Sequence, residues 1–227
     1  MFFNIKNFRT SNLLLTFAAT NKTKMEEKIK IVKIDVDGVL RDLTSAMCML
    51  YNDYFGTSLT PDMLTNYDVD HEELFRRTID EYHQLPSYWF FIDNGEQCFG
   101  TAPTCTGAAE SVKKLREDGF HVAICTWQMN YDNKCHTLDW LDFNGIEYDS
   151  IHFTKQKWMV NGDYMIDDNM EFLSNPLDTT KDKFLIRRPY NDIHLEEAKR
   201  LGIIPSNRIS DAVDVILQKS SSFGQDE

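Results

Sequence analysis

Two carboxylates, Asp35 and Asp37, are the side chains of this sequence whose types and spacing point most directly to chemistry. They follow a mainly apolar run over residues 31–34 and precede Gly38. The β-branched residues of the run, bounded by the glycine, predict a short β-strand. Because side chains alternate along a strand, the two carboxylates would point to the same side. The glycine lets the backbone turn sharply enough to hold both of them near one cation.

This pair of carboxylates predicts a magnesium-dependent phosphoryl-transfer site. A hard cation takes oxygen ligands. One carboxylate can attack phosphorus as a nucleophile while the other handles the proton of the leaving group. A calcium loop of the EF-hand type is the main alternative, but it requires a glutamate at its twelfth position, and the twelfth residue counted from Asp35 is Ala46. The sequence therefore argues against calcium.

Four further candidates lie at the ends of later predicted strands or shortly after them. A buried strand over residues 121–125 is followed by a threonine, and a strand over residues 164–166 is followed by two acids. A lysine lies ten residues before the first of these acids, and Lys155 competes with it. Open α/β sheets bind ligands at the carboxyl ends of their strands, so we expect these side chains to lie close together. They are Thr126, Lys157, Asp167 and Asp168.

These motifs, in this order, resemble those of the haloacid-dehalogenase-like (HAD-like) hydrolase superfamily. They are most similar to its 5′(3′)-deoxyribonucleotidase branch. One departure is Trp127, which stands where that branch commonly has a serine, and it leaves the nucleotide preference open. The matching segments are Asp-x-Asp-Gly-Val-Leu-x-Asp over residues 35–42, Ile-Cys-Thr over 124–126, Thr-x-x-Lys over 154–157 and Ile-Asp-Asp over 166–168.

The resemblance implies an α/β fold with a Rossmann-like parallel sheet in the strand order 5-4-1-2-3 and helices on both faces. It also implies a small helical cap inserted after the first strand. Apolar residues between positions 42 and 103 do recur at spacings of three and four, which predicts helices there. The core would then comprise residues 25–41 and 104–218, and the cap residues 42–103.

The resemblance also implies a role for each candidate. Asp35 would be the nucleophile that forms an aspartyl-phosphate, and Asp37 would act as general acid and then as base. Thr126 would donate a hydrogen bond to the transferring phosphoryl group, and Lys157 would neutralise its charge. The implied cofactor is Mg²⁺, and its ligands would be Asp35, Asp37 through its backbone carbonyl, and the pair formed by Asp167 and Asp168.

The implied substrate is a small phosphorylated molecule, with a nucleoside monophosphate as the first choice. The insert is rich in aromatic residues, and rings such as Tyr67 and Trp89 could stack on a base because every base offers a π-face. Packing inside the protein is the alternative for each ring. The remaining options are another phosphometabolite, the 3′ end of a polynucleotide, or a catalytically silent binding protein. A homodimer is one option for the oligomeric state.

The composition limits what the molecule can bind. With 227 residues, 42% of them apolar, the chain can bury a core, and its net charge of −12 argues against extended nucleic acid. No apolar run reaches the roughly 20 residues of a membrane span. Five cysteines without a Cys-x-x-Cys pair are typical of reduced thiols rather than of a zinc site or a disulfide framework. We therefore expect an intracellular protein, with the cytoplasm as the default compartment.

The two ends of the chain differ from the rest. Residues 1–24 contain four basic residues and no acidic one, a composition typical of a targeting segment for an organelle. A disordered extension, or an upstream start with Met25 as the natural first residue of the fold, are the alternatives. Residues 219–227 are mostly small and polar, and we expect a frayed tail there.

Overall fold

A computed structural model describes residues 29–79 and 85–222 of the chain, and one parallel sheet runs through it. The strand order is β3-β2-β1-β4-β5-β6, so the predicted order 5-4-1-2-3 is present with a sixth strand added beside β5. The predicted α/β class with a Rossmann-like sheet is confirmed. The strands are β1 (Ile31–Ile34), β2 (His121–Thr126), β3 (Ser150–Phe153), β4 (Tyr164–Asp167), β5 (Asp182–Ile186) and β6 (Ile204–Ser206).

The register of the sheet aligns the carboxyl ends of its three central strands. Ile34 at the end of β1 pairs with Ile124 in β2 on one side and with Ile166 in β4 on the other. The residues that follow these three partners therefore leave the same edge of the sheet. This edge is where the first, second and fourth sequence motifs lie.

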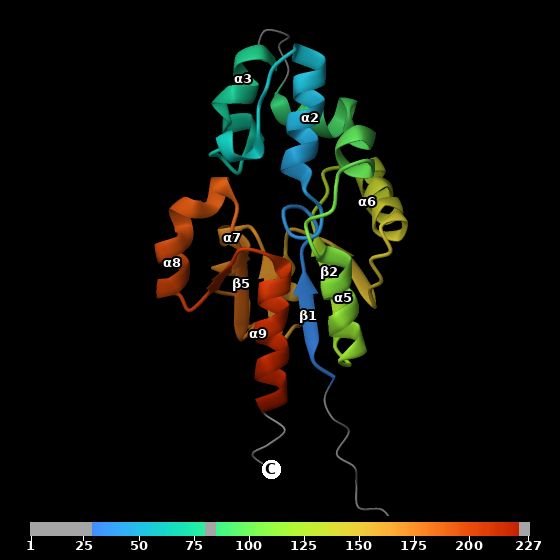
Figure 1. Ribbon diagram of the computed structural model, residues 1–227. Coiled ribbons are helices and arrows are strands. Elements are labelled where there is room, and N and C mark those ends of the chain that lie inside the picture. The colour runs from blue at the N-terminus through green and yellow to red at the C-terminus, as the bar shows by residue number, and fades with distance from the viewer. Residues whose placement is uncertain (1–28, 80–84, 223–227) are drawn as a thin grey trace, which may run out of the picture.

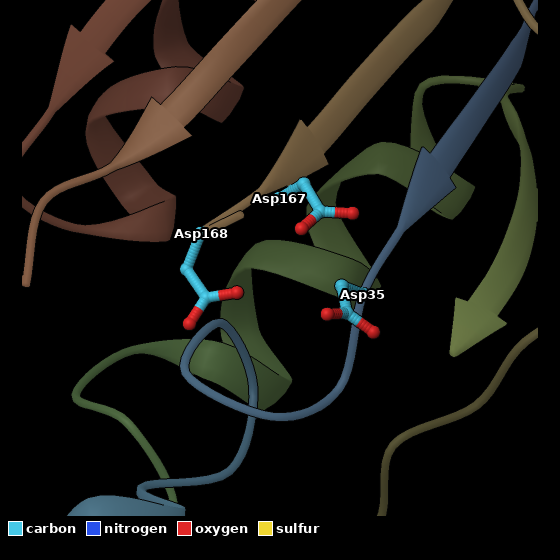
Figure 2. A group of neighbouring side chains, drawn as sticks. All are labelled: Asp35, Asp167 and Asp168. Atoms are coloured by element: carbon cyan, nitrogen blue, oxygen red, sulfur yellow. The ribbon is translucent and has the colours of Figure 1, made fainter. Parts of the chain in front are cut away.

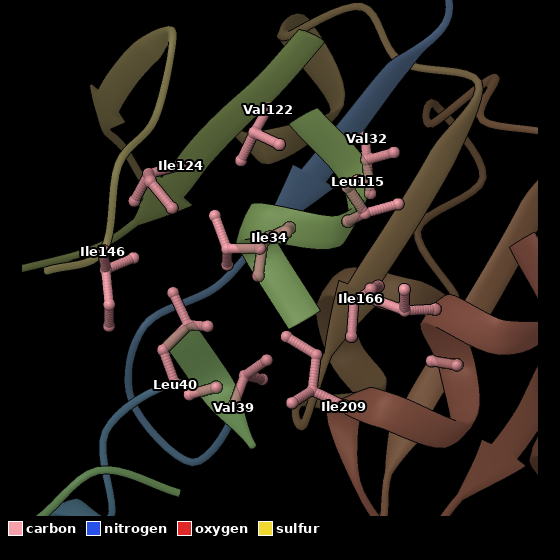
Figure 3. Packing of buried hydrophobic residues seen from close by; sticks show 14 of the residues in the cluster. Val32, Ile34, Val39, Leu40, Leu115, Val122, Ile124, Ile146, Ile166 and Ile209 are labelled. Atoms are coloured by element: carbon pink, nitrogen blue, oxygen red, sulfur yellow. The ribbon is translucent and has the colours of Figure 1, made fainter. Parts of the chain in front are cut away.

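Alternation along the strands gives the sheet two apolar faces. Val32, Ile34 and Ile166 belong to the large cluster that packs under α5 (Ala108–Glu117) and α9 (Ile209–Ser222) (Figures 1 and 3). Met165 and Leu185 point to the opposite face and pack in a smaller cluster. The elements that complete these layers are α6 (Tyr131–Phe143), α7 (Met170–Leu173) and α8 (Leu195–Arg200).

The chain between β1 and β2 forms a helical layer above the carboxyl edge of the sheet (Figure 1). It has its own apolar cluster, in which aromatic rings such as Tyr51, Phe75 and Phe90 pack together. Within the segment 42–103, where helices were predicted, one helix begins at Glu73 and reaches Ile79, and residues 80–84 lie outside the described part of the chain. The elements of this helical layer are α2 (Leu43–Phe55), α3 (Glu73–Ile79), α4 (Pro86–Tyr88), two 3₁₀ turns (Pro61–Met63, Val69–His71) and two π-helical turns (Trp89–Asp93, Glu96–Gly100).

The two connections between this layer and the sheet run side by side. Arg41 and Thr104 form an antiparallel bridge, the Asp42 amide donates to the carbonyl of Pro103 at 2.8 Å, and the Cys105 amide donates to the carbonyl of Leu40 at 2.8 Å. Helix α2 starts directly after them, where the Asp42 side chain accepts a hydrogen bond from the Ser45 amide. The exit from β1 and the return to β2 are thus paired to each other.

Three observations concern the boundaries of the fold. Helix α9 continues to Ser222, past Gln218 where the apolar pattern ends, so the first residues of the predicted tail are helical. The segment 1–24, with its predicted targeting or disordered character, lies outside the described residues. Within residues 29–79 and 85–222, no helix has both the length and the apolar character needed to cross a lipid bilayer.

Candidate active site

Three carboxylates meet at the carboxyl edge of the sheet. Asp35 follows β1, Asp167 ends β4 and Asp168 comes next, and Figure 2 shows the three side chains facing one another. One oxygen from each lies within 4.8 Å of the others, and all three residues are buried. Three buried like charges at this separation repel one another, so the cluster requires positive charge.

Lys157 supplies part of that charge. It lies in the short 3₁₀ turn Lys157–Met159, and its buried Nζ contacts Asp167 Oδ2 at 2.6 Å and Asp35 Oδ2 at 3.0 Å. The competing Lys155 lies instead with its ammonium 4.0 Å from the ring centroid of Trp127. Of these two lysines, only Lys157 reaches the acidic cluster.

The electrostatics of the cluster follow from burial and from this ion pair. Burial raises the pKa of Asp35 to about 7, against the opposing effect of Lys157, and repulsion from Asp167 adds to the rise. Burial, together with repulsion from Asp167 and Asp35, also raises the pKa of Asp168 well above its usual value. For Lys157, burial is the largest single effect and lowers the pKa, but the charges and hydrogen bonds of Asp167 and Asp35 together outweigh it, so the pKa rises.

The cluster also has unused oxygens that fit a divalent cation. Asp35 Oδ1 and Asp168 Oδ1 are buried and have no hydrogen-bond partner among the described residues. Both oxygens of Asp167 are engaged, one by Lys157 and the other by the Asn169 amide at 2.9 Å. Buried carboxylate oxygens without partners are costly unless a cation binds them, and hard cations such as Mg²⁺ take oxygen ligands. The residues present therefore fit a divalent metal.

The turn after β1 is packed closely against Asp168. Gly38 has φ = 72°, and a Cβ at this position would lie 2.0 Å from Asp168 Oδ2. The same carboxylate accepts a hydrogen bond from the hydroxyl of Tyr190, and Asn191 Nδ2 donates to the Asp168 carbonyl at 2.8 Å. Sequence reasoning missed Tyr190 and Asn191, which follow β5 without forming a motif.

Asp37 lies beside the cluster but outside it. Arg41 Nε donates to Asp37 Oδ1 at 2.7 Å, and Gln128 Nε2 donates to Asp37 Oδ2 at 2.8 Å. Its side chain is 22% exposed and lines the same cavity as Asp35. The two partners were missed as well, although Arg41 stands inside the first motif.

Thr126 ends β2 and is fully buried. Its Oγ1 has no hydrogen-bond partner within the described part of the chain, and the residue lines the cavity. A buried hydroxyl without a partner costs stability, and a ligand oxygen would satisfy it.

The cavity has a volume of about 670 Å³ and lies between the carboxyl edge of the sheet and the helical layer above it. Tyr67 is half exposed on its wall, with its ring centroid 5.7 Å from that of Tyr190. Trp89 is not on this wall. It is buried against Tyr51 and Phe55 in the aromatic cluster, so the predicted contact of Trp89 with substrate has no support in its position.

Comparison with known proteins identifies the relatives of this fold and site. Residues 29–218 match the model of a family described as 5′ nucleotidase, deoxy (pyrimidine), cytosolic type C protein. The chain belongs to this family. It is therefore a phosphatase of the nucleotidase type within the HAD-like hydrolases, as the motifs predicted.

Individual relatives are more distant. The chain is 26% identical over 158 residues to a protein of Chlorobaculum tepidum named "Putative 5′(3′)-deoxyribonucleotidase". The matched region covers 66% of this chain and 74% of that protein. A HAD family hydrolase from Deinococcus radiodurans with bound phosphate and sodium shares the fold, with a TM-score of 0.57, 14% identity, and coverage of 85% of this chain and 96% of that one. A phosphonoacetaldehyde hydrolase-like protein from Oleispira antarctica has a TM-score of 0.54, 12% identity, and coverage of 88% and 95%.

Proposed function

We propose that this nucleotidase-family protein is a Mg²⁺-dependent phosphomonoesterase that works through an aspartyl-phosphate on Asp35 and acts on nucleoside monophosphates, deoxy forms included. The observation that carries the proposal is the position of Asp35. It lies in the cavity wall with one oxygen held by Lys157 at 3.0 Å and the other without a partner among the described residues.

In the first step, a carboxylate oxygen of Asp35 forms a bond to phosphorus while the bond from phosphorus to the leaving oxygen breaks. Asp37 gives a proton to that leaving oxygen. Lys157 fixes Asp35 and offsets its charge, which favours the approach of an anionic phosphate. The unused hydroxyl of Thr126 donates a hydrogen bond to the phosphoryl group in transfer.

In the second step, water attacks phosphorus and gives its proton to Asp37, which now acts as the base. The bond between phosphorus and Asp35 breaks, and the enzyme returns to its starting state with inorganic phosphate released. Mg²⁺, held by Asp35, Asp167 and Asp168 and by the backbone carbonyl of Asp37, would neutralise charge on the phosphate when bound.

The remainder of the substrate occupies the cavity below the helical layer. In this proposal residues 42–103 form the cap, residues 25–41 and 104–218 form the core, and closure of the cap excludes water. Tyr67 offers its half-exposed ring to the base. Stacking of this kind is worth roughly 1–3 kcal/mol per base, so the preference for nucleotides is measurable without being extreme.

A substrate panel tests the proposal. Nucleoside monophosphates should give higher kcat/KM in Mg²⁺ than sugar phosphates or 3′-phosphorylated oligonucleotides. Tyr67→Ala should raise KM for nucleotides by about 5- to 150-fold, the equivalent of the lost stacking energy, and leave an aryl phosphate unaffected. Tyr88→Ala is the matched control, because Tyr88 is a cap tyrosine with nearly the same exposure that does not line the cavity.

Two results would contradict the proposed substrate. A clear advantage for sugar phosphates or oligonucleotides would leave phosphatase chemistry in place and remove the nucleotide assignment. An equal KM rise for nucleotide and aryl phosphate in Tyr67→Ala would show that the ring does not bind the base.

A further inference from the structure

Arg41 carries the most completely buried guanidinium near the candidate site, with no exposed surface. Its three nitrogens reach three different elements: Nε donates to Asp37 at 2.7 Å, Nη1 to the Phe99 carbonyl at 2.8 Å, and Nη2 to Thr137 Oγ1 at 3.1 Å. The rings of Phe99 and Trp140 lie 4.9 and 5.2 Å from its central carbon. Burial of a charged group is costly, so such a site needs this complete set of partners.

The two hydrogen bonds to Asp37 are not equivalent. Gln128, which binds Oδ2, lines the cavity, so a bound substrate can replace it. Arg41, which binds Oδ1, does not line the cavity and is closed off from solvent. Substrate can therefore take over Oδ2 while the bond from Arg41 to Oδ1 stays in place.

Arg41 is itself fixed by the connections between cap and core. Its backbone pairs with Thr104 across the two antiparallel connections, and Phe99 belongs to the last π-helical turn before the chain returns to the sheet. Thr137 lies on α6 of the core. The orientation of the Asp37 carboxylate is thus set by a group held from both the cap and the core.

We infer that Arg41 is a positioning residue for Asp37: it fixes one carboxylate oxygen so that the other faces the leaving oxygen of the substrate. This inference rests on the proposed function, because it assumes that Asp37 transfers the proton. A purely structural ion pair is the competing explanation, and it would affect every substrate alike.

The leaving group separates the two explanations. An alkyl phosphate has a poor leaving group and needs the proton from Asp37, whereas an activated aryl phosphate does not. General acid catalysis contributes about 10²- to 10⁴-fold, so loss of part of it is easily measured. A positioning role predicts a fall in the ratio of alkyl to aryl kcat/KM, which reports the phosphorylation step and not the hydrolysis step that both substrates share. A structural role predicts no fall.

The test measures kcat and KM for a nucleoside monophosphate and for an aryl phosphate. Arg41→Met should lower the alkyl-to-aryl ratio of kcat/KM about tenfold or more, a share of the acid's contribution. In Asp37→Asn the ratio is already low, and adding Arg41→Met should not lower it further, because the two residues act through one group. Arg116→Met is the matched control, since Arg116 forms ion pairs with Glu147 and Asp149 and does not line the cavity.

Arg116→Met should leave the kcat/KM ratio unchanged, because the ion pairs of Arg116 do not reach the cavity. Arg41→Lys keeps the charge but not the planar fork, so it should show a smaller fall in the ratio than Arg41→Met. If Arg41→Met does not fold, the ratio in Arg41→Lys decides the question. Equal losses for both substrates in the folded Arg41 variants, or a further fall of the ratio in the double variant, would overturn the inference.

Failure of the proposed function gives a different result. In that case Asp37→Asn alone would leave the alkyl-to-aryl ratio at the wild-type value, whatever Arg41 does. A low ratio in Asp37→Asn together with a normal ratio in Arg41→Met removes only the positioning role.

Discussion

At the scale of single residues, the site is an arrangement of charges that burial makes unfavourable and that only specific partners make tolerable. Asp35, Asp167 and Asp168 are buried together, and Lys157 neutralises only part of their charge. A divalent cation and an anionic substrate complete the set. Backbone geometry also constrains the site, because Gly38 lies so close to Asp168 that a side chain at position 38 would collide with the carboxylate.

Gly38→Ala should therefore damage both stability and catalysis. The left-handed backbone costs a non-glycine residue roughly 1–2 kcal/mol, and the added Cβ would lie 2.0 Å from Asp168 Oδ2. We expect a clear fall in melting temperature together with loss of most Mg²⁺-dependent activity. Thermal unfolding and steady-state kinetics measure the two effects.

Gly119→Ala is the control for backbone cost alone. Gly119 also has a positive φ, of 84°, but nothing lies within 4 Å of its Cβ position. This variant should lose stability and keep its activity. Normal Mg²⁺-dependent turnover in Gly38→Ala would mean that Asp168 tolerates displacement and does not shape the site.

At the scale of secondary structure, the site is made by the ends of β1, β2 and β4, which the register places at one level. Because the carboxyl groups at these strand ends are buried, their protonation affects the stability of the fold. In the metal-free protein, the raised pKa of Asp35 means that the folded state keeps a proton that the unfolded chain releases, so stability falls as the pH rises from about 4 to about 7. A cation binds the ionised carboxylates and should reverse this loss.

The gain in melting temperature on adding Mg²⁺ should accordingly be larger near pH 8 than near pH 5, because protons compete with the metal. Asp168→Asn removes one buried negative charge, so it should stabilise the metal-free protein at the higher pH and shrink the gain from Mg²⁺. Glu171→Gln is the control, since Glu171 lines the cavity outside the cluster. Equal gains at both pH values and in all variants would place the metal elsewhere.

The parts of this site that could be predicted from sequence are those that strand ends place. Asp35, Thr126 and Asp167 follow or end short apolar strands, and a parallel sheet brings such ends together. Lys157 could be named by its spacing from Asp167, although its choice over Lys155 needed the geometry.

The missed features depend on long-range contacts. Gln128 and Tyr190 contact acidic groups 91 and 22 residues away, which no local pattern encodes. Arg41 lies only four residues from Asp37, but its side chain is held by Phe99 and Thr137, which are far along the chain. Strand β6 has three residues and a central proline, which is tolerated at the edge of a sheet but gives no strand signal. Trp89 illustrates the opposite error, because an aromatic-rich segment does not reveal which rings face a cavity and which fill the core.

At the scale of the whole molecule, the sheet and the helical layer above it contribute different groups to the cavity. The sheet carries the acidic cluster at its carboxyl edge. The helical layer above it (Figure 1) lines the cavity with rings such as Tyr67 and Phe91 and has its own apolar cluster. The paired connections around Arg41 and Thr104 join the two parts next to the acid–base candidate. In the proposed mechanism, this short segment of chain would link binding of the substrate's organic part to proton transfer to its leaving group.

The central claim is that Asp35 carries the phosphoryl group, and trapping that intermediate tests it most directly. Asp37→Asn should react with an activated aryl phosphate, which needs no acid, and then hydrolyse slowly because it lacks the base. Acid quenching in Mg²⁺ followed by peptide mass spectrometry should find the phosphoryl group on Asp35, and none after the further change Asp35→Asn. Phosphorylation of another residue, or an unmodified Asp35 in protein quenched during turnover while product accumulates, would contradict the account.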